Sequence, residues 1–381
     1  MTGSTISGNS ATGDGGGIFT FDAGEVTVTG STISNNTAGD DGGGIFSDTN
    51  LSSQTTVITN STISGNTAGD SGGGIFNLDG LTRIVSSTVT GNQAAMGGGV
   101  SSFDDNGTST EVSSTIIAGN TATTDGAGSD VASQSGTNTT SSFVSQGFNL
   151  IGDGQHASVD FFSVTNPDND LVGTTANPLD PRLGDLADNG GPTQTHALLL
   201  DSPAIDADNS ALSTDGRGLV RAVDFEFVAN ASNGSDIGAF ELQTTDPLSI
   251  PLVVASASGL ADGNITPGEL SLREAIELAN LLSGADTITF DSSLSGQTIT
   301  LAGTELAISE SLTIDANDLT GGLTIDGVNA SRLLNFTAIT GDLTVRGLEL
   351  VRGEADGNGG AILFGSNGDL RVENSLSLIH I

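Results

Sequence analysis

The chain has 381 residues, of which 46 are acidic and nine are basic, and its formal net charge is −37. A charge of this sign repels nucleic-acid phosphates and anionic membrane surfaces, so we exclude nucleic acid as a partner. The sequence contains no cysteine, which excludes disulfides, thiol nucleophiles and cysteine-based zinc sites. No run approaches the roughly 18 to 20 apolar residues of a membrane helix, so we predict no integral membrane segment here.

A short motif repeats through the first 120 residues. Ser4-Thr-Ile-Ser-Gly-Asn9 returns in copies that begin at Ser31, Ser61, Ser87 and Ser114, at spacings of 27, 30, 26 and 27 residues. A glycine triplet and an apolar residue follow each of the first four copies. One such unit cannot bury its own apolar side, whereas stacked copies bury a continuous core. The repeat therefore predicts a parallel β-helix, which is an all-β solenoid.

The second repeat predicts three strands, at residues 25–29, 32–34 and 43–46, because apolar and polar residues alternate there. We expect one inward column of Ile6, Ile33, Ile63, Val89 and Ile116. We expect a second column, at a turn, of Asn9, Asn36, Asn66, Asn92 and Asn120. Asparagine accepts left-handed backbone angles and can share side-chain hydrogen bonds with the copy above. Phe19, Phe46 and Phe76 are expected to stack in the core.

These repeats resemble the polymorphic outer-membrane and right-handed parallel β-helix families. The shared features are the Ser-Thr-Ile-Ser-Gly-Asn motif and the Gly-Gly-Gly-Ile element, with Gly359-Gly-Ala-Ile362 as a later form of the second. The resemblance implies a right-handed parallel β-helix, and we expect two tandem modules with one short capping helix. It carries little information about activity.

The middle of the chain resembles the choice-of-anchor Q family over roughly 100 residues. The motifs that carry this resemblance are Asn149-Leu-Ile-Gly152, Asn177-Pro-Leu-Asp-Pro181, Leu186-Ala-Asp-Asn-Gly-Gly-Pro-Thr-Gln-Thr-His-Ala-Leu198, Ser202-Pro-Ala-Ile-Asp206, Asp215-Gly-Arg-Gly218 and Asp236-Ile-Gly-Ala-Phe-Glu241. The family implies a secreted bacterial protein in which this segment ends a β-helix ahead of a surface anchor. We therefore assign residues 1–120 to β-helix repeats and 121–243 to the irregular end of the first β-helix.

A second module is expected over residues 244–375. Its Leu270-Ser-Leu-Arg-Glu-Ala275 is similar to the CSLREA domain, with Leu270 where that motif has cysteine. Apolar residues at 272, 275, 276, 279 and 282 predict an amphipathic helix that covers the first rung of this module. Strands are predicted at 287–290, 298–301, 312–314, 323–325, 343–345, 348–350, 361–364 and 370–372. Residues 376–381 look like a translated sequencing adapter, and we interpret the chain as a fragment of a longer protein.

Three aspartates precede the glycine triplets and are the metal-site candidates. If Asp14, Asp41 and Asp70 stack into a column, their carboxylates could bind Ca²⁺, which prefers several oxygen ligands, or act as the paired acids of a polysaccharide hydrolase. Asp-Gly is also the simplest turn chemistry, and we favour that interpretation. Calcium is accordingly the single cofactor hypothesis, and no catalytic residue is assigned.

Two further groups are interpreted as structural. Arg217 and Arg221 lie near Asp206, Asp215, Asp236 and Glu241 in the sequence, which favours an ion-pair cluster over an active cleft. His196 stands beside neither a second histidine nor a cysteine. We therefore expect it to make structural hydrogen bonds and not to bind a metal.

The sequence favours a secreted or surface-displayed, adhesin-like structural protein of bacteria that presents polar faces to glycans or other proteins. The alternative is a polysaccharide lyase or glycoside hydrolase of the pectin-lyase-like class. Arg83, the one arginine among the repeats, lacks an acidic cluster on its strand, and the chain has no Trp or Tyr platform for a sugar. An outward threonine column at Thr5, Thr32, Thr62, Thr88 and Thr115 leaves ice binding as a third hypothesis. The sequence leaves the oligomeric state open.

Overall fold

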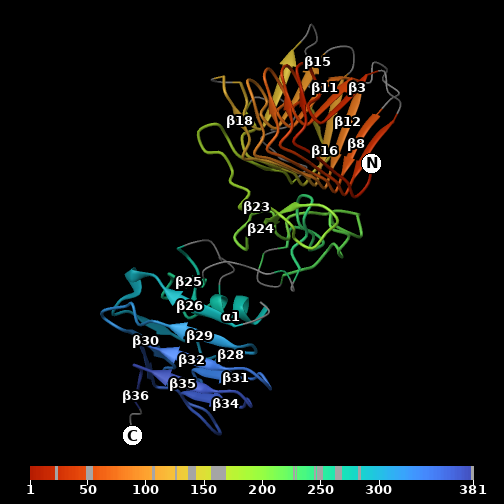
Figure 1. Ribbon diagram of the computed structural model, residues 1–381. Helices are drawn as coiled ribbons and strands as arrows, with labels where there is room; N and C mark the ends of the chain where they lie inside the picture. Colours follow the sequence, from red (N-terminus) through yellow and green to blue (C-terminus); the bar gives the residue numbers. More distant parts are fainter. Residues whose placement is uncertain are drawn as a thin grey trace. The chain divides into compact units, whose positions relative to one another are not determined.

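The computed structural model describes residues 1–21, 25–48, 55–104, 108–124, 127–135, 143–155, 169–225, 228, 230–243, 246, 252–261, 268–281 and 285–378. The chain forms two compact units, residues 1–242 and 243–381. Each contains a parallel β-helix, and within each unit Figure 1 shows strands from successive turns stacked side by side. The predicted all-β, right-handed parallel β-helix with a single short α-helix is confirmed.

Four parallel sheets build the first β-helix. The first, which we call the threonine sheet, contains β1 (Thr5–Ser7), β5 (Thr32–Ser34), β9 (Thr62–Ser64), β13 (Thr88–Thr90), β17 (Ile116–Ile117), β21 (Leu150–Ile151) and β22 (Leu171–Val172). The second contains β2 (Ser10–Ala11), β6 (Thr37–Ala38), β10 (Thr67–Ala68), β14 (Gln93–Ala94) and β18 (Thr121–Ala122). The third contains β3 (Ile18–Phe21), β7 (Ile45–Asp48), β11 (Ile75–Asp79), β15 (Val100–Asp104) and β19 (Val131–Ser135). The fourth contains β4 (Val26–Thr29), β8 (Thr55–Thr59), β12 (Leu81–Val85), β16 (Ser109–Ser113) and β20 (Phe143–Ser145). The two-residue strands of the second sheet were not predicted.

The inward column of the threonine sheet departs from the prediction at its fifth copy. Ile6 pairs with Ile33, and β13 pairs with β17 so that Val89 lies opposite Ile117 and Thr88 opposite Ile116. The prediction that Ile116 joins the inward column is therefore wrong, and Ile117 occupies that place. The reason is that Thr115, not Ser114, continues the serine column, since the Ser87 N–H is donated to Thr115 Oγ1.

The asparagine column is confirmed as a hydrogen-bonded ladder. Asn36 donates both its N–H and its Nδ2 to Asn66 Oδ1, at 3.0 and 2.9 Å, and the same pattern joins Asn66 to Asn92. Asp130 ends the ladder by accepting two bonds from Asn120. The left-handed backbone angle belongs to the residue before each asparagine, such as Gly65 at φ 68°, and not to the asparagine itself.

The phenylalanines do stack, but outside the core. Phe46 lies between Phe19 and Phe76, with ring centroids 5.0 and 5.5 Å away. In this sheet the isoleucines that precede them, such as Ile45, face the interior. Because neighbouring strand residues point to opposite faces, the rings form a row on the outer face. The prediction of a core position is therefore wrong for Phe19, which is 52% exposed, whereas Phe46 and Phe76 are buried as predicted but lie outside the interior isoleucine column.

The second unit is a three-sheet β-helix. Its first sheet contains β25 (Leu252–Val254), β26 (Asp286–Phe290), β29 (Leu312–Asp315), β32 (Leu343–Arg346) and β35 (Leu370–Glu373). Its second contains β27 (Thr298–Thr300), β30 (Leu323–Asp326), β33 (Leu348–Val351) and β36 (Leu376–Leu378). Its third contains β28 (Leu306–Ile308), β31 (Leu334–Phe336) and β34 (Ile362–Phe364), of which the first two were not predicted. A 3₁₀ turn, η2 (Ser292–Leu294), follows β26.

The predicted helix is present as α1 (Leu272–Leu281), and it contacts β25, β26 and β28 of the first rung. Ser271 and Glu274 form a capping box, in which Glu274 Oε2 accepts from the Ser271 N–H at 2.9 Å and the Ser271 hydroxyl at 2.7 Å. Leu272, Ile276 and Leu278 are buried against the rung. The helix therefore covers the end of the second β-helix, as the apolar stripe predicts.

Candidate functional site: a clamp on the first β-helix

Residues 182–242, which we call the clamp, lie across the outer face of the threonine sheet. They begin with a hairpin, β23 (Leu183–Ala187) and β24 (Thr195–Leu198), and continue without regular strands. Contacts along the clamp reach successive turns of the β-helix. Thr32 Oγ1 donates to the Gln194 carbonyl, Asn60 Nδ2 to the Thr214 carbonyl at 2.8 Å, and Ala239 N to Thr88 Oγ1 at 3.0 Å.

The clamp buries the middle of the threonine column. Thr32, Thr62 and Thr88 are at most 2% exposed, whereas Thr5, at the end of the sheet, is exposed. Gly238 lies on the column, with φ +107°, and a Cβ there would lie 2.9 Å from both Thr88 Oγ1 and Ile116 Cδ1. The ice-binding hypothesis required these threonines on a free face, so it is wrong. Thr115 was also misplaced, because it belongs to the serine column.

His196 anchors the hairpin to the same sheet. Its Nδ1 lies 2.7 Å from the Gly184 carbonyl and its Nε2 lies 2.8 Å from Ser64 Oγ. A carbonyl only accepts, so Nδ1 carries the proton and Nε2 accepts from the serine hydroxyl. Burial lowers the pKa of His196, which keeps the ring neutral. The predicted hydrogen-bonded structural role is confirmed.

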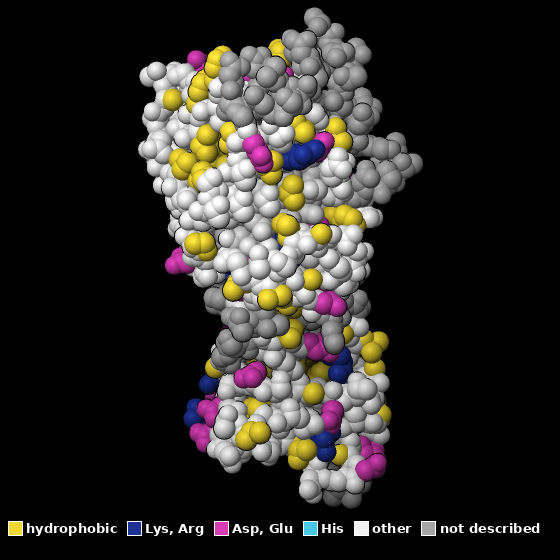
Figure 2. Space-filling view, turned by 90° about the vertical axis from the view of Figure 1, so that its right-hand side faces the viewer, with side chains coloured by type: hydrophobic (Ala, Val, Ile, Leu, Met, Phe, Trp, Pro, Cys, Tyr) yellow, Lys and Arg dark blue, Asp and Glu magenta, His cyan; other side chains and the backbone are white. Residues whose placement is uncertain are grey.

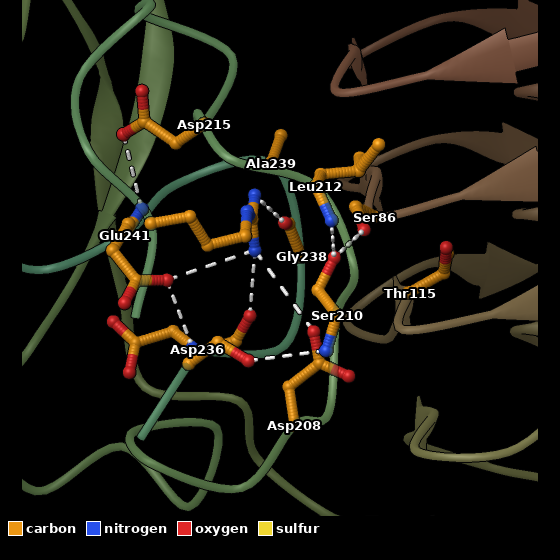
Figure 3. Close-up of polar contacts among 12 residues, drawn as sticks. Ser86, Thr115, Asp208, Ser210, Leu212, Asp215, Asp236, Gly238, Ala239 and Glu241 are labelled. Carbon is orange, nitrogen blue, oxygen red and sulfur yellow. Dashed lines mark hydrogen bonds and ion pairs between the residues drawn. The ribbon is translucent and has the colours of Figure 1, made fainter. Parts of the chain in front are cut away.

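Behind this contact the clamp holds an ionic cluster of Asp206, Asp208, Asp215, Arg217, Arg221, Asp236 and Glu241, part of which Figure 3 shows. Arg217 Nε is 2.8 Å from Asp215 Oδ2, and its guanidinium lies 3.7 Å from the centre of the Phe240 ring. Arg221 donates from Nη1 to the Asp236 carbonyl at 2.8 Å and from Nη2 to the Gly238 carbonyl at 2.9 Å. The two arginines therefore link separate parts of the clamp to one another.

The cluster is closed to solvent. The side chains of Asp208, Asp215, Arg217, Arg221 and Glu241 in its ion pairs are all 0% exposed. Burial raises the pKa of Glu241 to about 7 and that of Asp208 to about 6. Substrate cannot reach these carboxyl groups without opening the clamp. The expectation of a structural ion-pair cluster, and not an active cleft, fits this burial.

The aspartates proposed for calcium do not form a single column. Asp41 N donates to Asp14 Oδ1 at 3.1 Å, and Ser71 N donates to Asp41 Oδ1 at 2.8 Å. Asp70 stands one residue earlier, where its N–H is donated to the Asp40 carbonyl. Burial, and to a smaller extent the charges of Asp14 and Asp70, raise the pKa of Asp41. In the described residues no group of three or more His, Asp or Glu has the arrangement of a metal site, and calcium binding stays a prediction.

A groove of about 530 Å³ opens on the second unit, and no sequence motif predicted it. Its walls are residues 303–305, 329–332 and 354–356. Glu305 is held at 2.6 Å by Arg332 Nη1 and at 2.6 Å by Asn335 Nδ2. Arg332 also donates to the carbonyls of Asn358 and Gly359, so its guanidinium is engaged on several sides. The groove thus presents a fixed carboxylate together with the exposed acids Glu354 and Asp356.

The comparison with known families agrees with the repeat architecture. A family model of the Chlamydia polymorphic membrane protein repeat matches residues 3–20 and 30–48. The matched residues lie in the first two repeats of the first unit. No curated protein and no solved structure matches the chain. In the described part of the chain, no helix has the length and hydropathy needed to span a membrane.

Proposed function

We propose that this chain is part of a secreted or surface-displayed bacterial protein whose β-helices act as a structural, adhesin-like scaffold. The observation that carries the proposal is the polymorphic-membrane-protein-like repeat stacked into a polar-faced solenoid. Ser, Thr, Asn, Gly and backbone atoms make up most of the face in Figure 2, with acidic and apolar side chains interspersed. Such a surface suits hydrogen bonding to glycans or to other proteins.

Within this proposal the two irregular segments have separate roles. Residues 121–243 form the choice-of-anchor Q-like end of the first β-helix and include the clamp. Residues 244–375 form the second β-helix module, which starts with the CSLREA-like segment that supplies its cap. Support comes from the motifs themselves and from the capping box that Ser271 and Glu274 form.

The second candidate function is polysaccharide cleavage in the groove. It is favoured by one observation, the convergence of Glu305, Arg332, Glu354 and Asp356 on the same solvent-filled space. The engagement of Arg332 by Glu305 and two backbone carbonyls argues against its acting as a base.

A glycan array with the labelled full chain tests the first proposal, and an assay for new reducing or unsaturated sugar ends tests the second. We expect binding without cleavage. Glu354→Gln should weaken glycan binding in the groove, whereas Asp369→Asn, an exposed acid outside it, should not. Release of sugar ends that Glu305→Gln abolishes would establish the enzyme instead. Failure to bind any glycan or protein would contradict the adhesin role.

A further inference from the structure

The ionic cluster of the clamp has an unbalanced charge. Five carboxyl groups face two guanidinium groups, an excess of three negative charges if every carboxyl were ionised. Burying uncompensated charge costs several kcal/mol per ion. A closed cluster must therefore recruit protons or cations that the open, solvated segment does not need.

The hydrogen bonds of the carboxyl groups indicate which of them are most readily protonated. Both oxygens of Asp236 accept backbone N–H groups, from Asp206 and Leu242, and both oxygens of Glu241 do the same, from Val223 and Asp236. In contrast, Asp206 Oδ1 is buried and has no hydrogen-bond partner, and neither oxygen of Asp208 accepts a bond of full hydrogen-bond geometry, although the Ser114 hydroxyl and the Ser210 N–H lie near it. Asp206 and Asp208 are 0% exposed. A buried carboxylate oxygen without a donor is the least costly place for a proton.

We propose that the clamp is a proton-linked latch, in which Asp206 and Asp208 take up protons as the clamp closes on the first β-helix. Figure 3 shows Asp208 and Ser210 on the segment of the clamp that faces Ser86 and Thr115 of the β-helix. Asp208 thus lies at the contact that opening would break, whereas Asp206 contacts Asp236 and Phe225 inside the clamp.

The surroundings of these carboxyls favour the protonated form. From the clamp, the charge of Asp224 favours protonation of Asp206, while the Arg221 guanidinium lies 4.0 Å from Asp208 and opposes the shift. Burial also raises the pKa of Asp236 and of Glu241, so these neighbouring carboxyls take up protons as well when the clamp closes. Among the described residues, the β-helix faces them with neutral groups such as Asn60, Thr88 and Ser114. Burial raises the pKa of both Asp206 and Asp208 to about 6, against weaker lowering by the Phe225 N–H and by the Ser114 hydroxyl.

The direction in which the stability of the closed clamp changes with pH follows from these pKa values. Each carboxyl has a higher pKa in the closed clamp than in the open one, where it is near 3.8. The closed state therefore binds more protons, and its stability is fully present below about pH 4 and is lost as the pH rises through 6. A shift of two pKa units corresponds to an opening equilibrium about 100-fold larger per carboxyl at pH 7 than at pH 4.

Hydrogen exchange on the full chain tests the latch. The amides of Gly238 and Ala239, which donate to Ser114 and Thr88, report opening directly. After correction for intrinsic exchange, we expect their protection to fall at least about 100-fold between pH 4 and 7. Protection in β7 and β11 should stay constant. Protection of the bridging amides that does not change with pH would overturn the proposal.

Two variants test whether protonation of Asp206 and Asp208 causes the pH dependence of amide protection. Asp208→Asn should raise protection at pH 7 and remove only its own share, about 100-fold, of the pH dependence, and Asp206→Asn, which retains a residue suited to φ 52°, should act in the same direction. Asp188→Asn removes one charge from an exposed position of the same segment, where the amide oxygen can still accept the Gly190 N–H, and should leave the pH profile unchanged. An Asp208→Asn variant with the wild-type profile would contradict the proposal. So would protection at pH 7 that calcium restores and a chelator removes, because a cation would then balance the cluster.

Discussion

Arg221 and Asn60 are joined by a hydrogen bond of 3.1 Å from Nη2 to Oδ1, although 161 residues separate them in the chain. Asn60 lies in a turn of the first β-helix with a φ of 49°, and its Nδ2 donates in the other direction to the Thr214 carbonyl. One amide side chain is thus held by two parts of the clamp. This contact ties the irregular segment to a particular turn of a repetitive surface.

Gly238→Ala should destabilise the clamp strongly. A methyl group there would lie 2.9 Å from Thr88 Oγ1 and Ile116 Cδ1, and the φ of +107° is unfavourable for alanine. Gly218 also has a positive φ, +84°, but has open space around it. We expect a loss of about 2 to 4 kcal/mol for Gly238→Ala and about 1 kcal/mol for Gly218→Ala, in denaturant unfolding of the first unit. Equal losses for the two variants would show that close packing at Gly238 contributes little.

Asn66→Ala should weaken the middle of the ladder. It removes the acceptor of two bonds from Asn36 and the donor to Asn92 and to the Ile33 carbonyl, all of them buried. Unsatisfied buried groups cost about 1 to 3 kcal/mol each, so we expect a loss of several kcal/mol in the free energy of unfolding. Asn9→Ala, at the exposed end of the ladder, is the matched control and should cost about 1 kcal/mol or less. A small loss at Asn66 would contradict a cooperative ladder.

Ser271→Ala tests the cap of the second β-helix. The variant loses the side-chain half of the capping box, which donates to Glu274 Oε2 at 2.7 Å. We expect a loss of about 1 kcal/mol in unfolding of the second unit and faster hydrogen exchange in the first turn of α1. Ser292→Ala, an exposed serine in η2, should change neither quantity. Unaltered exchange in α1 would indicate that packing alone holds the helix.

Thermal melts with calcium and with a chelator decide the role of the aspartates. Asp14 and Asp41 already accept backbone N–H groups from the next rung, which suits turn capping. We therefore expect the same melting midpoint in both conditions, and little effect of Asp41→Asn because its amide oxygen still accepts. A midpoint that rises with calcium in the wild type and not in Asp41→Asn would establish the calcium hypothesis.

The sequence predicted the parts of the fold that each repeat specifies locally. Equivalent positions of successive repeats have the same environment, so aligning the repeats reveals them. Examples are the alternating Val26 and Val28 and the asparagine of each turn. The α1 helix was equally visible, because its apolar stripe and its Ser271–Glu274 pair lie within one short segment. The register of the fifth copy was predicted wrongly because Ser114-Thr115 has the same residue types as Ser87-Thr88 of the fourth copy. In the structure Thr115, and not Ser114, occupies the position equivalent to Ser87.

The site was predicted only in part. The proximity of the charged residues in the sequence predicted that they form a cluster, but it did not predict that the cluster is buried. The contacts that close the clamp, such as Gly238 N to the Ser114 carbonyl, join segments more than a hundred residues apart and leave no periodic trace. The groove around Glu305 was missed for a similar reason, since its walls come from three consecutive rungs.

The turn that receives Arg221 also limits how the gene can vary. Gly3, Gly30, Asn60, Ser86 and Ser114 occupy the same turn position, all with φ between 43° and 53°. Of these five residues, Asn60 alone carries an amide. Unequal recombination that deleted or duplicated one repeat between Asn60 and the clamp would preserve the solenoid and yet move this amide away from Arg221 by one rung, about 4.8 Å. The contact therefore constrains the number of repeats that follow Asn60, and it places no constraint on the number that precede it.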